Sequence, residues 1–202
     1  MKKLIKASLF IGAALLSLGS GSVAYAATTP QTSTSTADLT PGTITLDSVP
    51  GGSTSSTDTG GITFGTVASS ASDTSYKSTG ISSALHVTNP GQATGWAVTV
   101  SNSDFTDASG GTLKGAVLSL DSTKTPAISA DAADNVSALP TFDASLALSS
   151  APVAIASAPA GAGVGAYTAS YNPSDASLSV PAGNVGGSYT STLTWTLSNA
   201  PS

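Results

Sequence analysis

The last stretch of the chain constrains the fold more than any other. From Tyr189 to Pro201 the sequence alternates with a period of two, and most of its odd positions carry large apolar or aromatic side chains. Side chains of a β-strand point alternately to opposite faces, so this pattern predicts a strand with one buried face. The large residues are Tyr189, Leu193, Trp195 and Leu197, and the even positions between them carry Thr190, Thr192, Thr194 and Thr196.

The chain has one other tryptophan, and it lies in a similar setting far upstream. Trp96, Val98 and Val100 alternate there with small residues. Each tryptophan shares its face with aliphatic side chains, which favours burial over the alternative of exposed platforms that stack on sugar rings. We therefore expect two strands that contribute Trp96 and Trp195 to one shared core.

Composition predicts an all-β protein with little helix. The chain is rich in Thr, Ser, Val and Gly, and it has neither Glu nor Arg, so the unbranched helix formers are scarce. Short apolar runs separated by Gly- and Pro-rich turns predict roughly ten strands in an antiparallel β-sandwich or a barrel-like sheet, two architectures that the pattern does not distinguish. The runs cover residues 43–46, 62–64, 85–87, 96–100, 118–120, 146–148, 153–155, 167–171, 178–180 and 189–197.

The terminal stretch resembles the pattern Tyr-x-x-x-Leu-Thr-Trp-x-Leu-x-x-x-Pro of WxL-domain proteins, a family of surface proteins of low-GC Gram-positive bacteria. The residues that match this second motif are Tyr189, Leu193, Thr194, Trp195, Leu197 and Pro201. Gly95, Trp96 and Val98 resemble the first motif of the family, with Val98 where the signature has Leu. The resemblance covers residues 43–202.

The resemblance implies a function and a location. It implies a non-catalytic extracellular protein of the Gram-positive cell surface that attaches non-covalently to the peptidoglycan of the cell wall, docks a WxL-interacting surface protein, or does both. Two other functions stay open. One is a structural surface subunit that assembles through strand edges, and the other is an Asp-based glycoside hydrolase.

Three segments are expected along the chain. Residues 1–26 have the pattern of a secretory signal, with three lysines, an apolar run from Leu9 to Leu18 and a small-residue cleavage site at Ala24 to Ala26. The apolar run is too short to span a membrane, and no second run of that length follows, so we expect no transmembrane anchor in the mature chain. Residues 27–42 form a flexible Thr-, Ser- and Pro-rich lead-in, and residues 43–202 form the wall-binding domain.

Charge and cysteine content argue against a nucleic acid-binding protein and against a disulfide-stabilised domain. Without its signal the chain keeps three lysines against eleven aspartates, a formal net charge of −8. Three lysines are too few to bind the phosphates of a nucleic acid, which argues against a nucleic acid partner. The chain has no Cys, so an exported domain must rely on its core rather than on disulfides.

No residue pattern points to catalysis, a cofactor or a metal. His86 is the only histidine, and it lies between two apolar strand residues, so we expect it on the solvent face, without the cluster that zinc needs. Two pairs of aspartates could serve a glycosidase, Asp104 with Asp107 and Asp131 with Asp134, but each lies in a polar loop. With Asn102 and Asn135 these loops could also ligate calcium, although their spacing is not that of an EF-hand and favours solvated turns.

Overall fold

The computed structural model describes residues 30–52 and 61–199, and the regular secondary structure in these ranges is entirely β-strand. The predicted signal at residues 1–26 lies outside the described residues, as do residues 53–60 and Pro201 of the second motif. The chain divides into residues 1–38 and a compact unit of residues 39–202, and every strand belongs to this second unit.

The described part of the chain forms fourteen short strands. All of their pairings are antiparallel, which confirms the expected all-β class. The strands are β1 (Thr45–Ser48), β2 (Ile62–Thr63), β3 (Thr74–Lys77), β4 (Gly80–Ile81), β5 (Leu85–Asn89), β6 (Trp96–Asn102), β7 (Val117–Asp121), β8 (Ile128–Ala130), β9 (Thr141–Phe142), β10 (Ser145–Ala147), β11 (Val153–Ala158), β12 (Gly165–Ala169), β13 (Ala176–Val180) and β14 (Leu193–Ser198).

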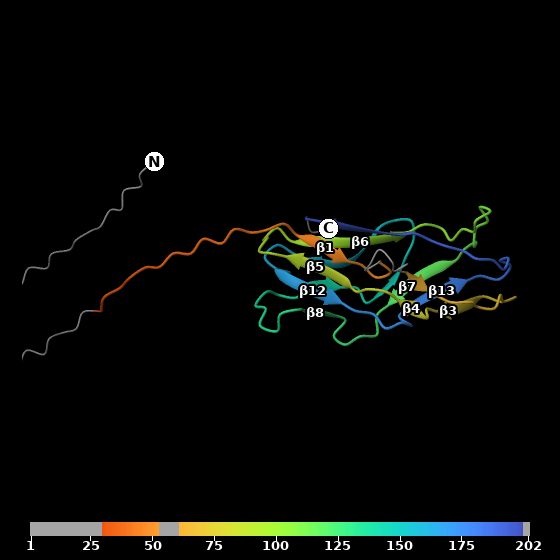
Figure 1. The fold of residues 1–202 in the computed structure, drawn as a ribbon, viewed down its shortest axis with the longest axis horizontal. Helices are drawn as coiled ribbons and strands as arrows, with labels where there is room; N and C mark the ends of the chain where they lie inside the picture. The colour runs from red at the N-terminus through yellow and green to blue at the C-terminus, as the bar shows by residue number, and fades with distance from the viewer. Residues whose placement is uncertain (1–29, 53–60, 200–202) are drawn as a thin grey trace, which may run out of the picture. The chain divides into compact units, whose positions relative to one another are not determined.

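Three four-stranded sheets and one small ribbon organise these strands in a sandwich-like arrangement. The tryptophan sheet has the order β14-β6-β11-β9, the histidine sheet β1-β5-β12-β8 and the end sheet β10-β7-β13-β3, while β2 pairs with β4 alone. Figure 1 shows β5, β12 and β8 side by side at one end of the unit, and β7, β13 and β3 at the other. Among the described strands, no two neighbours in a sheet are consecutive in the chain, so each sheet joins segments that are separated by at least one other strand.

The core lies where the tryptophan sheet packs against the other two sheets. Trp96 of β6 is completely buried, and its ring centroid lies 6.5 Å from that of the buried Tyr167 of β12. Burying large side chains such as these removes apolar surface from water and is the main term that stabilises the sandwich. The other buried core residues are Ile44, Leu85, Val87, Val98, Val100, Leu118, Leu120, Leu148, Ile155, Ala156, Ala158, Ala169 and Ala176.

The strands differ from the sequence-based prediction in number and in bounds. The short strands β3, β4, β8 and β9 were not predicted, because two to four residues carry too little alternation to be recognised. At the C-terminus, β14 begins only at Leu193, so Tyr189 of the second motif precedes the strand. Thr190, next to it, forms an isolated bridge with Thr106 instead.

Candidate binding groove

The first motif forms the centre of the tryptophan sheet. Its strand, β6, pairs with β14 on one side and β11 on the other, and Trp96, Val98 and Val100 are all fully buried. The Trp96 indole Nε1 donates a hydrogen bond of 2.9 Å to the carbonyl oxygen of Gly163. Trp96 and Val98 therefore build the core, and neither side chain is accessible to a ligand.

Gly95 has a specific steric reason to precede Trp96. Its φ angle is +76°, a conformation that residues with a side chain rarely adopt. A Cβ atom at this position would lie 2.6 Å from the carbonyl oxygen of Ala158 and 2.9 Å from the backbone nitrogen of Ala160. The glycine lets the chain enter β6 close against the end of β11.

The second motif forms the outer strand of the same sheet. β14 pairs with β6 in a regular register in which Trp195 lies opposite Val100 and Leu197 opposite Val98. The expected alternation is present, because Leu193, Trp195 and Leu197 are half-buried against the core while Thr194 and Thr196 are exposed. Trp195 is thus less buried than Trp96, and the two tryptophans of the chain have different environments.

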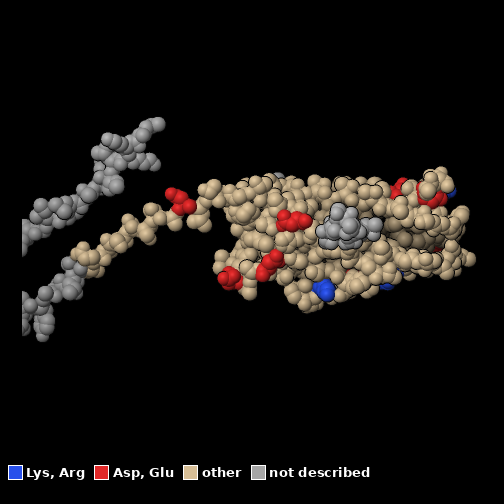
Figure 2. Space-filling view, viewed as in Figure 1, with Lys and Arg blue, Asp and Glu red and all other residues tan. Residues whose placement is uncertain are grey.

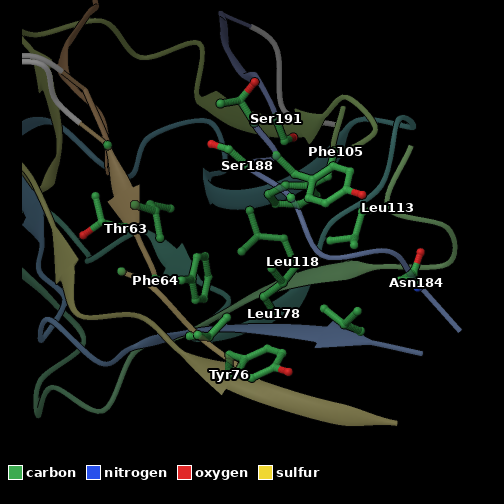
Figure 3. Close-up of a pocket in the computed structure, with 18 of the residues that line it drawn as sticks. Thr63, Phe64, Tyr76, Phe105, Leu113, Leu118, Leu178, Asn184, Ser188 and Ser191 are labelled. Atoms are coloured by element: carbon green, nitrogen blue, oxygen red, sulfur yellow. The ribbon is translucent and has the colours of Figure 1, made fainter. Parts of the chain in front are cut away.

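The exposed part of Trp195 faces a groove. This groove has a volume of about 920 Å³ and lies between β14 with the segment before it, the end sheet, and the segments that flank β2. Phe64, Phe105 and Leu118 project into it from different sides (Figure 3). Its volume is within the range of about 300–1,000 Å³ that small-molecule sites occupy.

The groove combines an apolar floor with a hydroxyl-rich, uncharged rim. No Asp or Lys is among the described residues that line it, although the chain as a whole has a net charge of −5. The larger apolar and aromatic side chains of the lining are Val49, Ile62, Phe64, Val67, Tyr76, Phe105, Leu113, Leu118, Leu178, Val180, Val185, Tyr189, Leu193 and Trp195. Apart from the two tyrosines, its hydroxyl groups come from serines and threonines between residues 63 and 72 and between 188 and 192.

Two tyrosines fix the loops that form the rim. Tyr189 donates its hydroxyl hydrogen to the carbonyl oxygen of Val185 at 2.9 Å, and Tyr76 donates to that of Ala68 at 2.6 Å. Asn184 ties the same rim to the segment before β7, because its Nδ2 donates to the Lys114 carbonyl oxygen and its Oδ1 accepts from the Lys114 backbone N–H. These bonds hold exposed residues such as Val185 beside the groove.

Comparison with known proteins identifies the family. The family model described as "WxL domain surface cell wall-binding" matches residues 26–201, which is most of the chain. The chain belongs to the WxL-domain family. It is therefore a cell wall-binding surface protein, and no curated protein and no solved structure matches it.

The described part of the WxL domain displays few charges on the face shown in Figure 2, where small groups of aspartates lie toward its two ends and most of the remaining described surface is uncharged. Within residues 30–52 and 61–199, no helix is long and apolar enough to cross a membrane.

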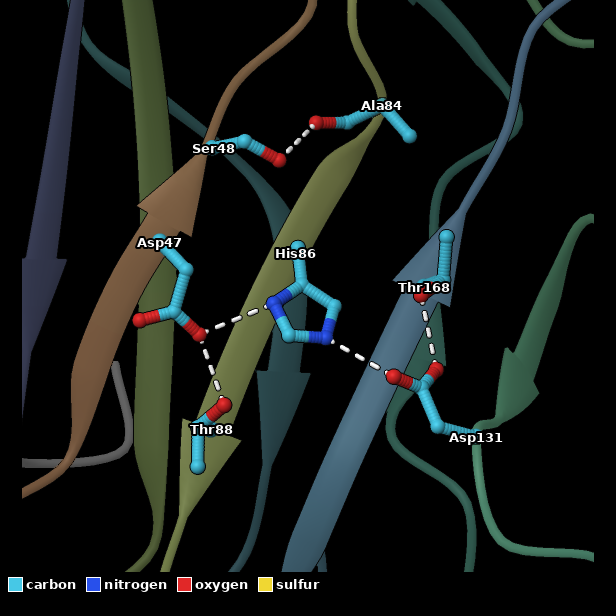
Figure 4. Close-up of polar contacts among 7 residues, drawn as sticks. All are labelled: Asp47, Ser48, Ala84, His86, Thr88, Asp131 and Thr168. Carbon is cyan, nitrogen blue, oxygen red and sulfur yellow. Dashed lines mark hydrogen bonds and ion pairs between the residues drawn. The ribbon is translucent and has the colours of Figure 1, made fainter. Parts of the chain in front are cut away.

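His86 has two acidic neighbours that the sequence did not predict. It projects from β5 between two carboxylates, with Nδ1 at 2.8 Å from Asp47 and Nε2 at 2.8 Å from Asp131 (Figure 4). Thr88 and Thr168 donate to the same two carboxylates. The cluster spans the outer face of the histidine sheet from β1 to the residue after β8, and its side chains remain partly exposed as predicted for His86.

Hydrogen bonds lower the pKa of both aspartates in this cluster. Partial burial raises the pKa of Asp47, but donors on Thr88, Thr45 and His86 outweigh it. The pKa of Asp131 is lowered chiefly by Thr168 and also by His86, against a smaller effect of burial. Each ring nitrogen of His86 faces one of these carboxylates, so neither nitrogen is directed at a site where a substrate could bind.

The other candidate residues do not form one site: Asn102 is the buried last residue of β6, and Asp107 lies in a turn. Asp107 Oδ1 accepts the backbone N–H groups of Ser109 and Gly111, each at 2.8 Å, which closes a tight turn. Asp131 contacts His86 and does not form the proposed catalytic pair with Asp134. Asn135 Nδ2 donates to the Val164 carbonyl oxygen and to the Tyr167 hydroxyl oxygen. In the described part of the chain, no group of three or more His, Asp or Glu side chains is arranged to hold a metal ion.

Proposed function

We propose that this WxL domain attaches non-covalently to peptidoglycan on the surface of a Gram-positive bacterium, and that it does so through the groove beside β14. The observation that carries the proposal is the uncharged lining of this groove in a mature chain with a net charge of −8. A wall rich in anionic polymers repels such a chain at long range, so attachment needs a surface that does not depend on opposite charge.

The side chains of the groove suit a glycan strand. Sugar rings offer apolar faces that pack on aromatic side chains such as Trp195 and Phe105, and their hydroxyl groups pair with donors and acceptors on serines and threonines. Ser188 and Ser191 lie on the rim above the aromatic floor and provide such groups (Figure 3).

The proposed role is non-catalytic. Each nitrogen of His86 faces a carboxylate, and Asp107 is engaged in a turn. A glycosidase needs two carboxyl groups that flank a sugar bond within a cleft, and the described lining of the groove has none.

A WxL-interacting surface protein is the second candidate ligand of the same groove. Phe64, Leu118 and Leu178 give the groove an apolar floor, which would also accept apolar side chains of a protein segment. Such a partner would occupy the groove in place of the glycan.

Cosedimentation with purified peptidoglycan tests the primary proposal. Val185 at the rim is 78% exposed and Val136 elsewhere is fully exposed, so lysine at either position leaves the core intact. We expect the protein without its signal, and its Val136→Lys variant, to sediment with peptidoglycan, while Val185→Lys loses most of the bound fraction because it places an ammonium group beside an apolar site.

Salt provides the second arm of this experiment. Binding through an uncharged groove should persist or strengthen as monovalent salt rises, with or without a chelator of divalent cations. Equal binding of Val185→Lys and Val136→Lys, or release by moderate salt, would contradict attachment through the groove. Binding to the WxL-interacting protein but not to bare peptidoglycan would establish the second candidate instead.

A further inference from the structure

The edge of the tryptophan sheet formed by β14 is open within the described part of the chain. β14 is the outermost strand of that sheet, and among the described residues β6 is the only strand that pairs with it. The pairing runs without a bulge from Leu193 opposite Asn102 to Ser198 opposite Ala97. Within residues 30–52 and 61–199, no strand therefore lies along the other side of β14 from Leu193 to Leu197.

The hydrogen bonds next to β14 show which backbone groups face outward. Thr190 and Thr106 exchange both of their backbone bonds at 2.9 Å, and Thr192 accepts from the Ser103 N–H at 2.9 Å. Backbone groups of successive residues in an antiparallel strand point to alternate sides. The even residues thus bond to β6, and the N–H and C=O groups of Leu193, Trp195 and Leu197 lie along the open edge.

The other outer strands of the three sheets carry features that block edge pairing. β9 has two residues, and β8 and β10 have three each. β1 has a bulge between Leu46 and Ser48 at the charged Asp47, and β3 ends in Lys77. Shortness, bulges and charges are the devices by which proteins protect sheet edges, and β14 has none of them.

The sequence of β14 is palindromic about Trp195. Leu193 and Leu197 stand two positions from it on either side, Thr194 and Thr196 stand one position from it, and the hydroxyl residues Thr192 and Ser198 stand three positions from it. An antiparallel partner with the same sequence, centred on the same residue, would place like residues opposite one another. The symmetry singles out a second copy of this chain as the occupant of the edge.

We propose that β14 pairs antiparallel with β14 of a second copy, with the two-fold axis at Trp195, so that the tryptophan sheets of both copies join. Leu193, Trp195 and Leu197 have the outward backbone groups, so they form the hydrogen-bonded pairs of the new ladder. Trp195 then lies opposite the partner's Trp195, and Leu193 lies opposite the partner's Leu197. On the exposed face Thr194 lies opposite the partner's Thr196, and aromatic and threonine pairs of this kind stabilise antiparallel sheets.

No charged side chain opposes the pairing where the two β14 strands would meet. Neither β14 nor the adjacent β6 contains an Asp or a Lys, whereas each mature copy as a whole carries a net charge of −8. The repulsion between copies is therefore long-range and screened by salt. Dimerisation should strengthen as salt rises.

Charge substitutions at the two exposed threonines test both the dimer and its register by analytical ultracentrifugation. In Thr194→Lys/Thr196→Lys, each lysine lies opposite a lysine of the other copy, and like charges in direct opposition destabilise a strand pair. In Thr194→Lys/Thr196→Asp, each lysine lies opposite an aspartate. We expect the unmodified protein to dimerise with rising concentration, the double-lysine variant to remain monomeric and the mixed variant to dimerise again.

A thermal melt of each variant confirms that it is folded, because Thr194 and Thr196 are exposed in the single copy. Val185→Lys is the control that separates this proposal from peptidoglycan binding, since it alters the groove and should leave dimerisation unchanged. A protein that stays monomeric at all concentrations overturns the proposal. If Thr194→Lys/Thr196→Asp does not dimerise, the proposed register is wrong. If β14 pairs only with a different protein, the proposal that its partner is a second copy of this chain is wrong.

The absence of cysteine allows a direct check of the register. Residues 194 and 196 of opposite copies would form non-hydrogen-bonded pairs, in which Cα atoms are about 4.5 Å apart and within disulfide range. Mixing Thr194→Cys with Thr196→Cys should give a disulfide-linked dimer under mild oxidation. Neither variant alone should give more than a trace, and cross-linking of each variant with itself would overturn the proposed axis.

Discussion

The indole Nε1 of Trp96 donates to the carbonyl oxygen of Gly163 at 2.9 Å, and this bond joins the centre of the tryptophan sheet to the loop before β12. The same oxygen accepts from Nδ2 of the buried Asn89 at 3.0 Å. A large apolar ring with a satisfied polar atom is the arrangement that allows complete burial of tryptophan. Trp96 is therefore a structural anchor of the WxL domain.

Replacing each tryptophan by alanine should have unequal effects. Trp96→Ala leaves a cavity in the core and should lower the free energy of unfolding by about 3–5 kcal/mol, out of a total of about 5–15 kcal/mol. Trp195→Ala removes a half-buried ring and should cost clearly less. Urea denaturation of both variants measures the difference, and an equal or larger loss for Trp195→Ala would show that its ring is a core residue after all.

The Gly95 position should tolerate no side chain. In Gly95→Ala the new Cβ would meet the Ala158 carbonyl oxygen at 2.6 Å in addition to the strain of a φ angle of +76°. Gly110→Ala is a matched control, because Gly110 has a φ angle of +85° with nothing within 4 Å of its Cβ position. Backbone strain should cost the control about 1–2 kcal/mol, and Gly95→Ala should lose more. Equal melting temperatures for the two variants would contradict the steric role of Gly95.

Local patterns predicted the strands with strong alternation. The period of two at Leu193, Trp195 and Leu197 is a property of neighbouring residues, so it identified β14 without knowledge of its partner. The pattern at Trp96, Val98 and Val100 did the same for β6. The degree of burial was less predictable, because it depends on whether a strand lies at the centre of a sheet, as β6 does, or at its edge, as β14 does.

The groove and the histidine cluster depend on segments that only the fold brings together. Phe64, Phe105 and Leu178 come from three separate regions of the chain, and no local spacing links them. His86 likewise meets Asp47 and Asp131, which are 39 and 45 residues away in sequence. Alternation placed His86 on the outer face, but it could not identify the carboxylates on either side.

Asp175 should make stability depend on pH in the acid range. Only 1% of the surface of Asp175 is exposed. Its carboxylate accepts hydrogen bonds from the Asn172 N–H at 2.6 Å and from the Thr123 hydroxyl at 2.7 Å. Burial raises its pKa, but these bonds outweigh burial and lower the pKa below the ordinary value. A lowered pKa means that the stabilisation is present at neutral pH and is lost as pH falls below about 4 towards the folded-state pKa.

Asp175→Asn is the variant that measures this contribution. It should lower the free energy of unfolding by about 1.5–3 kcal/mol at pH 7, the range for hydrogen bonds to charged groups. The difference from the unmodified protein should shrink as pH falls, because the carboxyl group is then protonated as well. Denaturation at several pH values checks both statements, and a difference that is constant down to the lowest pH would count against a charged Asp175.

Fluorescence of Trp195 tests ligand binding in the groove most directly. The variant Trp96→Phe retains Trp195 as its only tryptophan, so its fluorescence reports on the groove. Its melting transition checks that it is folded, and the measurement is made at protein concentrations where the chain is monomeric. The account predicts that soluble peptidoglycan fragments shift its emission to shorter wavelengths and protect it from acrylamide, while Trp195→Phe, which retains the buried Trp96, does not respond. Unchanged emission and quenching of Trp195 when calorimetry shows the fragments bound would place the binding site outside the groove and contradict the account.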